Sequence, residues 1–325
     1  MTLPSILSRA LGASALALVA CSALAQDYPT RPVTIVVPFS PGGGSDTGAR
    51  MLAHKLSEKW GRPVVVENKP GAAGMVGTEY VSRAKPDGYT LLVGNIGTQA
   101  INGSLYKKMR YDPVNGFAPV SLIAELPLVM LVHPSVPVKT PQELVAYAKS
   151  HPGELSYSSS GAGSSLHLAA ELFQAQSGTE LLHVPYKGSG AAMADLLAGH
   201  VKMSVTTVLE SSAQARTGKV RAVALTGASR SSALPDVPTL AETALPGFNS
   251  ISWIGLLAPA ATPEALVEKI SADVREVMAG DELKRRFVEQ GAVPAPTTPA
   301  QFRALIDNDR KRYAEIIRDK GITNE

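Results

Sequence analysis

The groups best suited to chemistry in this sequence are backbone amides in two glycine-rich turns. The first turn, residues 38–46, carries three consecutive glycines between an apolar stretch and a helical pattern that starts near Asp46. Glycines leave N–H groups accessible, and the N-terminus of a helix adds a partial positive charge. Such a turn can hold a carboxylate or a phosphate without lysine or arginine.

The second turn, residues 159–165, precedes another helical pattern and adds serine hydroxyls as donors. Each turn alone is weak evidence, because glycine-rich turns between strands and helices are common in α/β proteins. Asp46 taken alone is better explained as an acid that stabilises a helix N-terminus. Two such turns in matching places favour a site that grips one acidic ligand from two sides.

Other kinds of site find less support in the sequence. The first turn lacks the Gly-Lys-Ser/Thr end of a P-loop, and Leu166 stands where a dinucleotide fingerprint needs glycine. There is no Gly-x-Ser-x-Gly elbow, and the six histidines show no i,i+4 pair for a metal. We therefore predict neither a metal nor a cofactor. Spacing alone favours a structural role for His167, which follows the second turn.

Strand and helix patterns alternate along the chain and position these turns. Gly61 and Gly178 stand where left-handed residues end helices, and Thr140 and Thr298 begin capping boxes. This alternation predicts an α/β fold with parallel sheets. The predicted strands are 33–37, 64–66, 90–93, 155–158, 181–184, 203–206 and 220–225, and the main predicted helices are 46–60, 165–177 and 299–320.

Residues 1–25 have the features of a removable export segment. Arg9 precedes a short apolar run, and Ala23-Leu24-Ala25 matches a signal peptidase site. The alternative is a lipoprotein box at 18–21, which would anchor the protein through Cys21, the single cysteine. Removing 25 of 325 residues leaves 300, and losing Arg9 lowers the net charge from +3 to +2. The dispersed charges argue against nucleic acid as a partner.

A mature chain of this length is too long for one ordinary core, so two domains are expected. Extended apolar segments at 119–133 and 251–259 can carry the chain between them. We predict a first domain of residues 26–127 and 252–325 and a second domain of residues 128–251. Two crossings suit a hinge between the domains.

Several motifs in order then resemble one known family. They lie at 28–33, 38–46, 65–74, 86–90, 184–188 and 233–239. Together they resemble the periplasmic substrate-binding receptors of tripartite tricarboxylate transporters, often called Bug-type receptors, over essentially the whole mature chain. The resemblance implies a periplasmic-binding-protein-like clamshell of two doubly wound domains, a small carboxylate as ligand, a membrane permease as partner and a periplasmic location. We expect a monomer.

The resemblance also implies a set of ligand contacts from both domains. In the first domain they are Phe39, Ser40, Gly43, Gly44, Asp46, Thr98 and Gln99. In the second they are Ser159, Ser160, Gly161, Ser164 and, as a neighbour, His167.

One departure from the family bears on the ligand. Family members usually have an aspartate near the pocket where this chain has Thr206. Loss of that carboxylate removes a negative charge, which predicts a ligand without an ammonium group, such as a plain di- or tricarboxylate or an aromatic acid. Leu166 makes the second-domain edge more apolar.

Three alternatives stay open beside the transport receptor. An orphan receptor that feeds a sensor would have the same sequence features. A carboxylic-acid hydrolase or isomerase would need Asp46 and His167 as its acid–base pair, brought together from separate domains. A structural envelope protein would bind no small acid. We predict a binding protein and not an enzyme.

Overall fold

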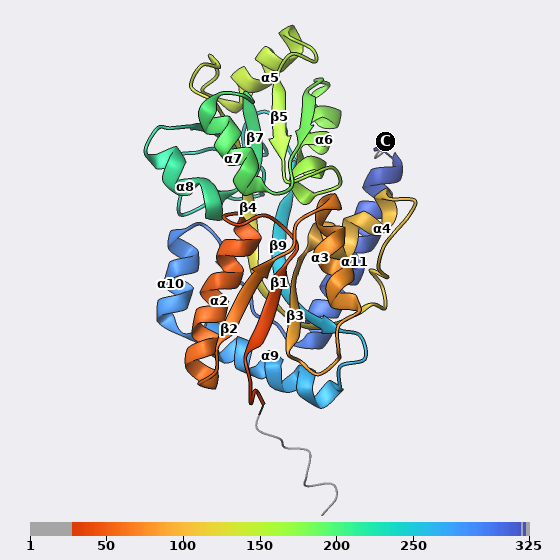
Figure 1. The fold of residues 1–325 in the computed structure, drawn as a ribbon. Helices are drawn as coiled ribbons and strands as arrows, with labels where there is room; N and C mark the ends of the chain where they lie inside the picture. The colour runs from red at the N-terminus through yellow and green to blue at the C-terminus, as the bar shows by residue number, and fades with distance from the viewer. Residues whose placement is uncertain (1–27, 320, 323–325) are drawn as a thin grey trace, which may run out of the picture.

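The computed structural model describes residues 28–319 and 321–322. The export segment and Cys21 lie outside the described residues. Figure 1 shows two lobes stacked end to end, with the N-terminal strands in the lower lobe and residues of the middle of the chain in the upper one. We call the lower lobe the first domain and the upper lobe the second domain.

The sheet of the first domain has a parallel part and an antiparallel part. The parallel strands are β1 (Val33–Val37), β2 (Val64–Asn68) and β3 (Thr90–Asn95). Antiparallel to β3 runs β9 (Ile251–Pro259), which pairs with the long strand β4 (Phe117–Val132). The short β10 (Val293–Pro294) pairs with β4.

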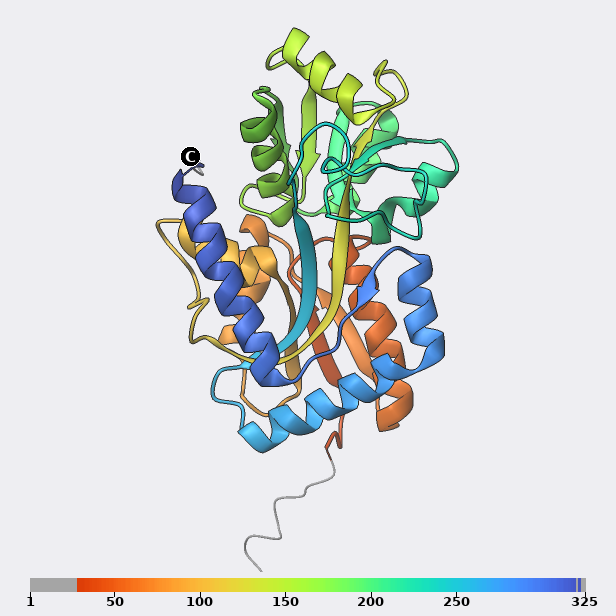
Figure 2. The ribbon, with the colours of Figure 1, turned by 180° about the vertical axis from the view of Figure 1, so that it is seen from behind.

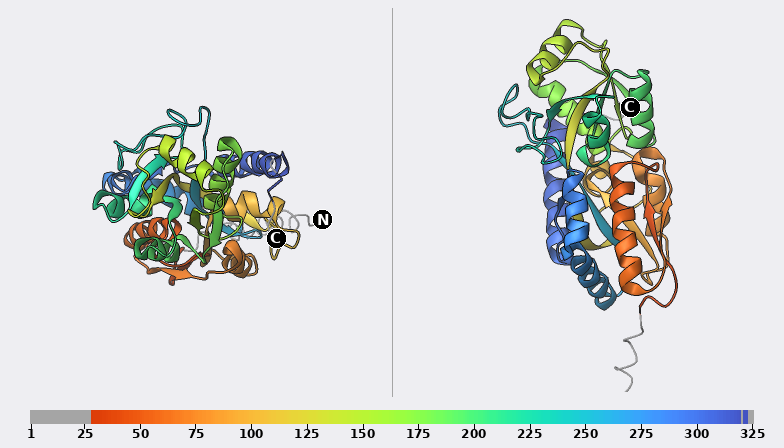
Figure 3. Two further views of the ribbon diagram at one scale, coloured as in Figure 1. Left: turned by 90° about the horizontal axis from the view of Figure 1, so that it is seen from above. Right: turned by 90° about the vertical axis from the view of Figure 1, so that its left-hand side faces the viewer.

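Helices cover both faces of this sheet, as the side view in Figure 3 shows. Ile35 packs in the cluster formed with α2, α9 and α10, whereas its neighbour Val36 packs in the cluster formed with α3 and α11. Successive side chains of a strand point to opposite faces, so one β1 strand serves both clusters. The helices are α2 (Gly44–Trp60), η1 (Ala72–Gly74), α3 (Met75–Ser82), η2 (Gly97–Ile101), α4 (Asn102–Leu105), α9 (Glu264–Ala279), α10 (Asp281–Glu289) and α11 (Pro299–Asp319).

The second domain repeats this plan. Met130 packs with α5 and α6 on one face of its sheet, and Leu131 packs with α7 on the other. The parallel strands are β5 (Ser156–Ser159), β6 (Leu182–Pro185) and β7 (Met203–Thr207), and β8 (Arg221–Leu225) pairs antiparallel with β4. The helices are α5 (Pro141–Ser150), α6 (Ser165–Ser177), α7 (Ser189–Ala198) and α8 (Val208–Arg216).

The strand β4 belongs to both domains. From Phe117 to Pro127 it pairs with β9, and from Leu128 to Val132 it pairs with β7 and β8. Figure 2 shows β4 and β9 as two long antiparallel strands that lie side by side and reach the junction. Because β4 changes its pairing partner between residues 127 and 128, we propose one domain limit there. We propose the second limit near the start of β9.

The C-terminal helix α11 crosses the back of the first domain (Figure 2). Phe302 and Ile306 pack in the cluster with α3, and the Trp253 indole N–H donates to Asp309 Oδ2 at 2.7 Å. Among the described helices, none combines the length and the apolar character needed to cross a membrane.

Candidate functional site

Four helix N-termini meet where the two domains touch. They belong to α2 in the first domain and to α6, α7 and α8 in the second. Residues from all four starts line one cavity of about 30 Å³. Its wall consists of Phe39, Gly43, Gly44, Ser45, Asn95, Leu126, Ser160, Ser165, Leu166, Ser189, Thr207 and Ser252. Because each helix start carries a partial positive charge, this point attracts an anion.

Glycines allow the two domains to approach each other closely here. A Cβ on Gly44 would lie 2.6 Å from Thr207 Oγ1, and one on Gly43 would lie 2.8 Å from Ser189 Oγ. From the other side, a Cβ on Gly190 would lie 2.4 Å from the Pro41 carbonyl oxygen. These separations are too short for real Cβ contacts, so larger residues would hold the domains apart. The glycines of the first turn therefore serve domain closure as well as amide exposure.

A partly buried carboxylate already accepts the N–H at the start of α2. Gly44 N–H donates to Glu210 Oε2 at 2.6 Å, and the Ser189 hydroxyl donates to the same oxygen at 2.7 Å. The other oxygen, Oε1, accepts the Thr207 N–H at 3.2 Å and the hydroxyl of Thr206. Burial raises the pKa of Glu210 to about 7, and the hydrogen bonds from Ser189, Thr207 and Gly44 oppose that rise.

Asp46 points away from the cavity and stabilises the first turn. Its carboxylate accepts hydrogen bonds from the Gly42 N–H at 2.9 Å, Arg50 Nε at 3.0 Å and Asn68 Nδ2 at 2.9 Å. Burial works to raise the pKa of Asp46, but these hydrogen bonds outweigh it and hold the pKa below its usual value. With its oxygens engaged inside the first domain, Asp46 is placed to cap the turn.

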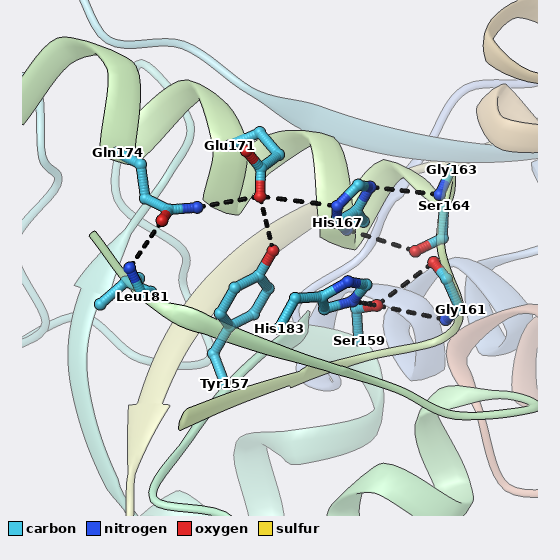
Figure 4. Close-up of polar contacts among 10 residues, drawn as sticks. All are labelled: Tyr157, Ser159, Gly161, Gly163, Ser164, His167, Glu171, Gln174, Leu181 and His183. Carbon is cyan, nitrogen blue, oxygen red and sulfur yellow. Dashed lines mark hydrogen bonds and ion pairs between the residues drawn. The ribbon is translucent and has the colours of Figure 1, made fainter. Parts of the chain in front are cut away.

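Side chains of the second domain hold the second turn from behind (Figure 4). The Gly163 N–H donates to His167 Nδ1 at 3.1 Å, and the Gly161 N–H donates to Ser159 Oγ at 3.2 Å. The His167 ring stacks on His183 with centroids 4.2 Å apart, and His183 Nε2 lies 2.7 Å from Ser159 Oγ. Two amides of this turn are thus used within the domain.

Both histidines of this cluster are neutral at ordinary pH. Burial lowers the pKa of His167 to about 4, and burial together with the charge of His167 lowers the pKa of His183 to about 4. Because His167 Nδ1 accepts an N–H, its ring proton lies on Nε2, 3.5 Å from Glu171 Oε1. Glu171 in turn accepts the Tyr157 hydroxyl at 2.9 Å (Figure 4).

Comparison with known proteins identifies the family. The family described as "Tripartite tricarboxylate transporter family receptor" matches residues 48–322. The chain belongs to this receptor family. It is 35% identical over 304 residues to Protein BugT of Bordetella pertussis, covering 93% of each chain. The expected relationship to Bug-type receptors is confirmed.

Solved structures confirm the clamshell fold as well. A protein of R. palustris solved with adipate has a TM-score of 0.89 at 36% identity, covering 91% of this chain and 99% of that one. MatC from Rhodopseudomonas palustris, solved with bound malate, has a TM-score of 0.84 at 33% identity, covering 89% and 100%. Both structures share the α/β fold of this chain over most of its length.

Four residues expected at the receptor's site line the cavity: Phe39, Gly43, Gly44 and Ser160. Ser40 lies beside it and bridges the domains, because its hydroxyl donates to the Lys187 carbonyl at 2.9 Å. The other expected residues are not in its wall: Asp46, Thr98, Gln99, Ser159, Gly161, Ser164, His167 and Thr206.

Several of these residues support the wall of the receptor's cavity from behind. Thr98 N–H donates to Asn95 Oδ1 at 3.0 Å, and Gln99 Nε2 donates to Thr98 Oγ1 at 3.3 Å. Asn95 is the member of this group that faces the cavity. Ser164 caps α6 by accepting the His167 N–H at 3.2 Å. Their hydrogen bonds hold the loops in place, and the neighbouring residues line the cavity.

The structure places a carboxyl group beside Thr206. The sequence suggested that this edge of the receptor lacks a carboxylate, but the Thr206 hydroxyl donates to Glu210. This carboxyl group stands four residues later, in the first turn of α8. The spacing of Thr207 and Glu210 is that of a capping box, and this signal would have predicted the helix start.

The sequence also missed α7, although Gly188 and Gly199 bracket it. The starts of α7 and α8 bring Ser189 and Thr207 into the wall. Thr207 is buried, and its Oγ1 faces the Glu210 N–H in the capping box without a hydrogen bond of full geometry. The cap uses the oxygen as an acceptor and leaves the hydroxyl proton unused, which is uncommon for a buried hydroxyl. Thr207 can therefore donate this proton to a ligand at the cavity.

Proposed function

We propose that this protein is a periplasmic receptor that closes its two domains on a small carboxylate and delivers it to a membrane permease. The observation that carries the proposal is the convergence of four helix N-termini from both domains on one cavity. The wall residues are uncharged, and serine and threonine hydroxyls add donors. Backbone amides, hydroxyls and helix dipoles suit a carboxylate that must also be released.

The known relatives support the ligand class. Two family members were solved with adipate and with malate, both dicarboxylates. For this chain we propose a plain di- or tricarboxylate or an aromatic acid. Glu210 places a carboxyl group beside Thr206, so the absence of an ammonium group in the ligand no longer follows from Thr206 alone.

The alternative function, a hydrolase or isomerase, would need Asp46 and His167 to form an acid–base pair, and these two residues are engaged elsewhere. Asp46 is engaged with Arg50 and Asn68 in the first domain. His167 holds Gly163 from behind the second turn. Neither side chain lies in the cavity wall. We therefore propose binding without turnover.

A thermal-shift screen tests the binding proposal directly. A ligand that binds only the folded protein at one hundred times its Kd raises the free energy of unfolding by about 2.7 kcal/mol. We expect one or more of adipate, malate, citrate, benzoate and glutamate to raise Tm, while the matching amides do not. The acid should be recovered unchanged after incubation.

Thr207→Val supplies the matched variant for this screen. It removes the hydroxyl and keeps the shape of the side chain, so carboxylate affinity should fall about tenfold, and loss of the cap on α8 should lower the stability of the free protein by about 1 kcal/mol. If no acid shifts Tm at millimolar concentration, or if acids and amides raise Tm equally, the proposal of a carboxylate receptor is wrong.

Delivery and location need separate experiments. Deleting the gene in the native bacterium should abolish high-affinity uptake of the labelled acid, whereas an orphan signalling receptor would leave uptake unchanged. Mass spectrometry of the periplasmic and membrane fractions should find a free N-terminus at Gln26. A lipid on Cys21 would instead show the anchored form.

A further inference from the structure

Glu210 occupies the place at the start of α2 where a ligand carboxylate is expected. We propose that Glu210 is an internal carboxylate that fills this anion-accepting position in the unliganded receptor, holds the domains together, and competes there with the ligand. The competition rests on the proposed function, because it requires a carboxylate ligand. The contact between the domains does not.

The four donors around Glu210 come from both domains. Each oxygen accepts one backbone N–H and one hydroxyl: Gly44 and Ser189 on Oε2, Thr207 and Thr206 on Oε1. Only Gly44 belongs to the first domain. A partly buried carboxylate depends on its donors, because each donor that is lost leaves an oxygen poorly compensated. Separation of the domains removes Gly44 and lets water reach the carboxylate instead.

The contact with Gly44 is more than a helix cap on α8. A cap requires only the bond from the Thr207 N–H to Oε1. The second oxygen, Oε2, reaches across to Gly44 at 2.6 Å. Asp46, the acid on α2 itself, is turned toward Gly42 and leaves the Gly44 amide to Glu210. The first turn of α2 is thus neutralised by the opposite domain.

A ligand carboxylate at the same position must displace Glu210. The Gly44 N–H is a single donor, and Glu210 Oε2 lies 2.6 Å from it. The cavity beside it, about 30 Å³, has room for one or two water molecules and not for a dicarboxylate. Entry of the ligand therefore requires the domains to part, which breaks the Gly44–Glu210 contact. The ligand then takes over the amide when the domains close again.

Glu210→Gln tests this contact with a minimal change of shape. Each Glu210 oxygen faces one backbone N–H, so a glutamine amide in either orientation places its NH₂ group against a backbone donor. Hydroxyl groups can turn to accommodate the change, but the two N–H groups cannot. The variant therefore weakens the bridge whichever way the amide points.

The first measurement uses no ligand. Spin labels on the two domains, or small-angle scattering, should show a compact wild type and a shift of Glu210→Gln to longer interdomain distances. Glu154→Gln removes the same charge from an exposed position of the second domain and should match the wild type. Ser189→Ala removes one donor to Oε2 without changing α8 and should open the protein to a lesser degree. Equal distances in the wild type and Glu210→Gln would overturn the proposal.

The second measurement is calorimetry with adipate. Without the internal competitor, Glu210→Gln should bind adipate about tenfold more tightly, whereas Glu154→Gln should bind as the wild type does. Weaker binding by Glu210→Gln would overturn the competition and make Glu210 a supporting group for the ligand. If adipate binds neither protein, the proposed function fails for that acid, and the ligand-free distances still decide whether Glu210 bridges the domains.

Discussion

The two glycine-rich turns look alike in sequence but use their amides differently. In the first turn, the Gly44 N–H points across the junction and meets a carboxylate from the opposite domain. In the second turn, the N–H groups of Gly161 and Gly163 are taken by Ser159 and His167 of the same domain. Closure of the domains satisfies the Gly44 N–H of the first turn, whereas the two N–H groups of the second turn are satisfied within their own domain.

This difference assigns the two turns different tasks. In the proposed mechanism, the Gly44 N–H of the first turn gains or loses a carboxylate when the domains move, so its hydrogen bond depends on whether a ligand is bound. The second turn and the first residues of α6 form part of the cavity wall, with Ser160, Ser165 and Leu166 lining it. A glycine pattern therefore predicts accessible amides, but the acceptors that reach them decide what each amide does.

The largest expected effect comes from preventing the first turn from approaching the second domain. Gly44→Ala should weaken carboxylate binding at least about a hundredfold, roughly 2.7 kcal/mol. The reason is steric: the new Cβ would lie 2.6 Å from Thr207 Oγ1 in the closed form. Calorimetry with the best acid of the screen checks this, and urea unfolding should show little loss of stability.

Gly280→Ala is the matched control for that variant. Gly280 lies between α9 and α10, and a Cβ there would meet only the Val277 carbonyl oxygen, at 3.3 Å. Its affinity should equal that of the wild type. Unchanged affinity in Gly44→Ala would mean that the bound form does not bring α2 against Thr207.

The positions of the turns could be predicted from the sequence, whereas the groups that accept hydrogen bonds from their N–H groups could not. The helix predicted at 165–177 is α6, which runs from Ser165 to Ser177, and Gly178 adopts the expected left-handed conformation at φ 64°. Strand and helix periodicity is a local property, so one sequence suffices to find it. The long strand β4 was expected as an extended segment at 119–133 and runs from Phe117 to Val132.

The bridge across the junction required the folded structure. Glu210 follows Gly44 by 166 residues, and no local pattern links an acid to an amide so far away. The occupied amides of the second turn are a milder case. Gly163 and His167 are four residues apart, so this hydrogen bond was local, but a ring nitrogen can serve a ligand or a backbone N–H equally well.

A smaller effect is expected from removing the support of the second turn. His167→Leu leaves the buried Gly163 N–H without an acceptor, which should lower the free energy of unfolding by about 2 kcal/mol at pH 7. His167→Asn, whose side-chain oxygen can replace Nδ1, should recover most of the loss. Urea unfolding measures both, with His54→Leu on the exposed face of α2 as the control.

The pH dependence separates His167 from a simple packing residue. Burial lowers its pKa from 6.5 to about 4, so the neutral form is preferred in the folded state and stability is lost as pH falls through this window. At pH 5 the wild type should have lost about 2 kcal/mol from this group. The gap between the wild type and His167→Leu should therefore shrink toward zero near pH 5. A constant gap from pH 7 to pH 5 would contradict the role of neutral His167.

The smallest expected effect concerns the first turn and has the opposite direction with pH. Burial raises the pKa of Glu210 from 4.5 to about 7 in the closed form, so protonation favours closure. Unlike the amide of Glu210→Gln, the protonated carboxyl still presents an oxygen to each backbone N–H, and the Ser189 or Thr206 hydroxyl can turn to accept its proton. Between pH 8 and pH 6 the ratio of closed to open unliganded receptor should rise about tenfold, roughly 1.4 kcal/mol. On α2, Asp46 and Arg50 are paired with each other, and the first residues of α7 carry no charge. Interdomain distances measured at both pH values should therefore change in the wild type and stay constant in Glu210→Gln. If the variant changes as the wild type does, another group controls closure, and the contrast between the two turns does not extend to their response to pH.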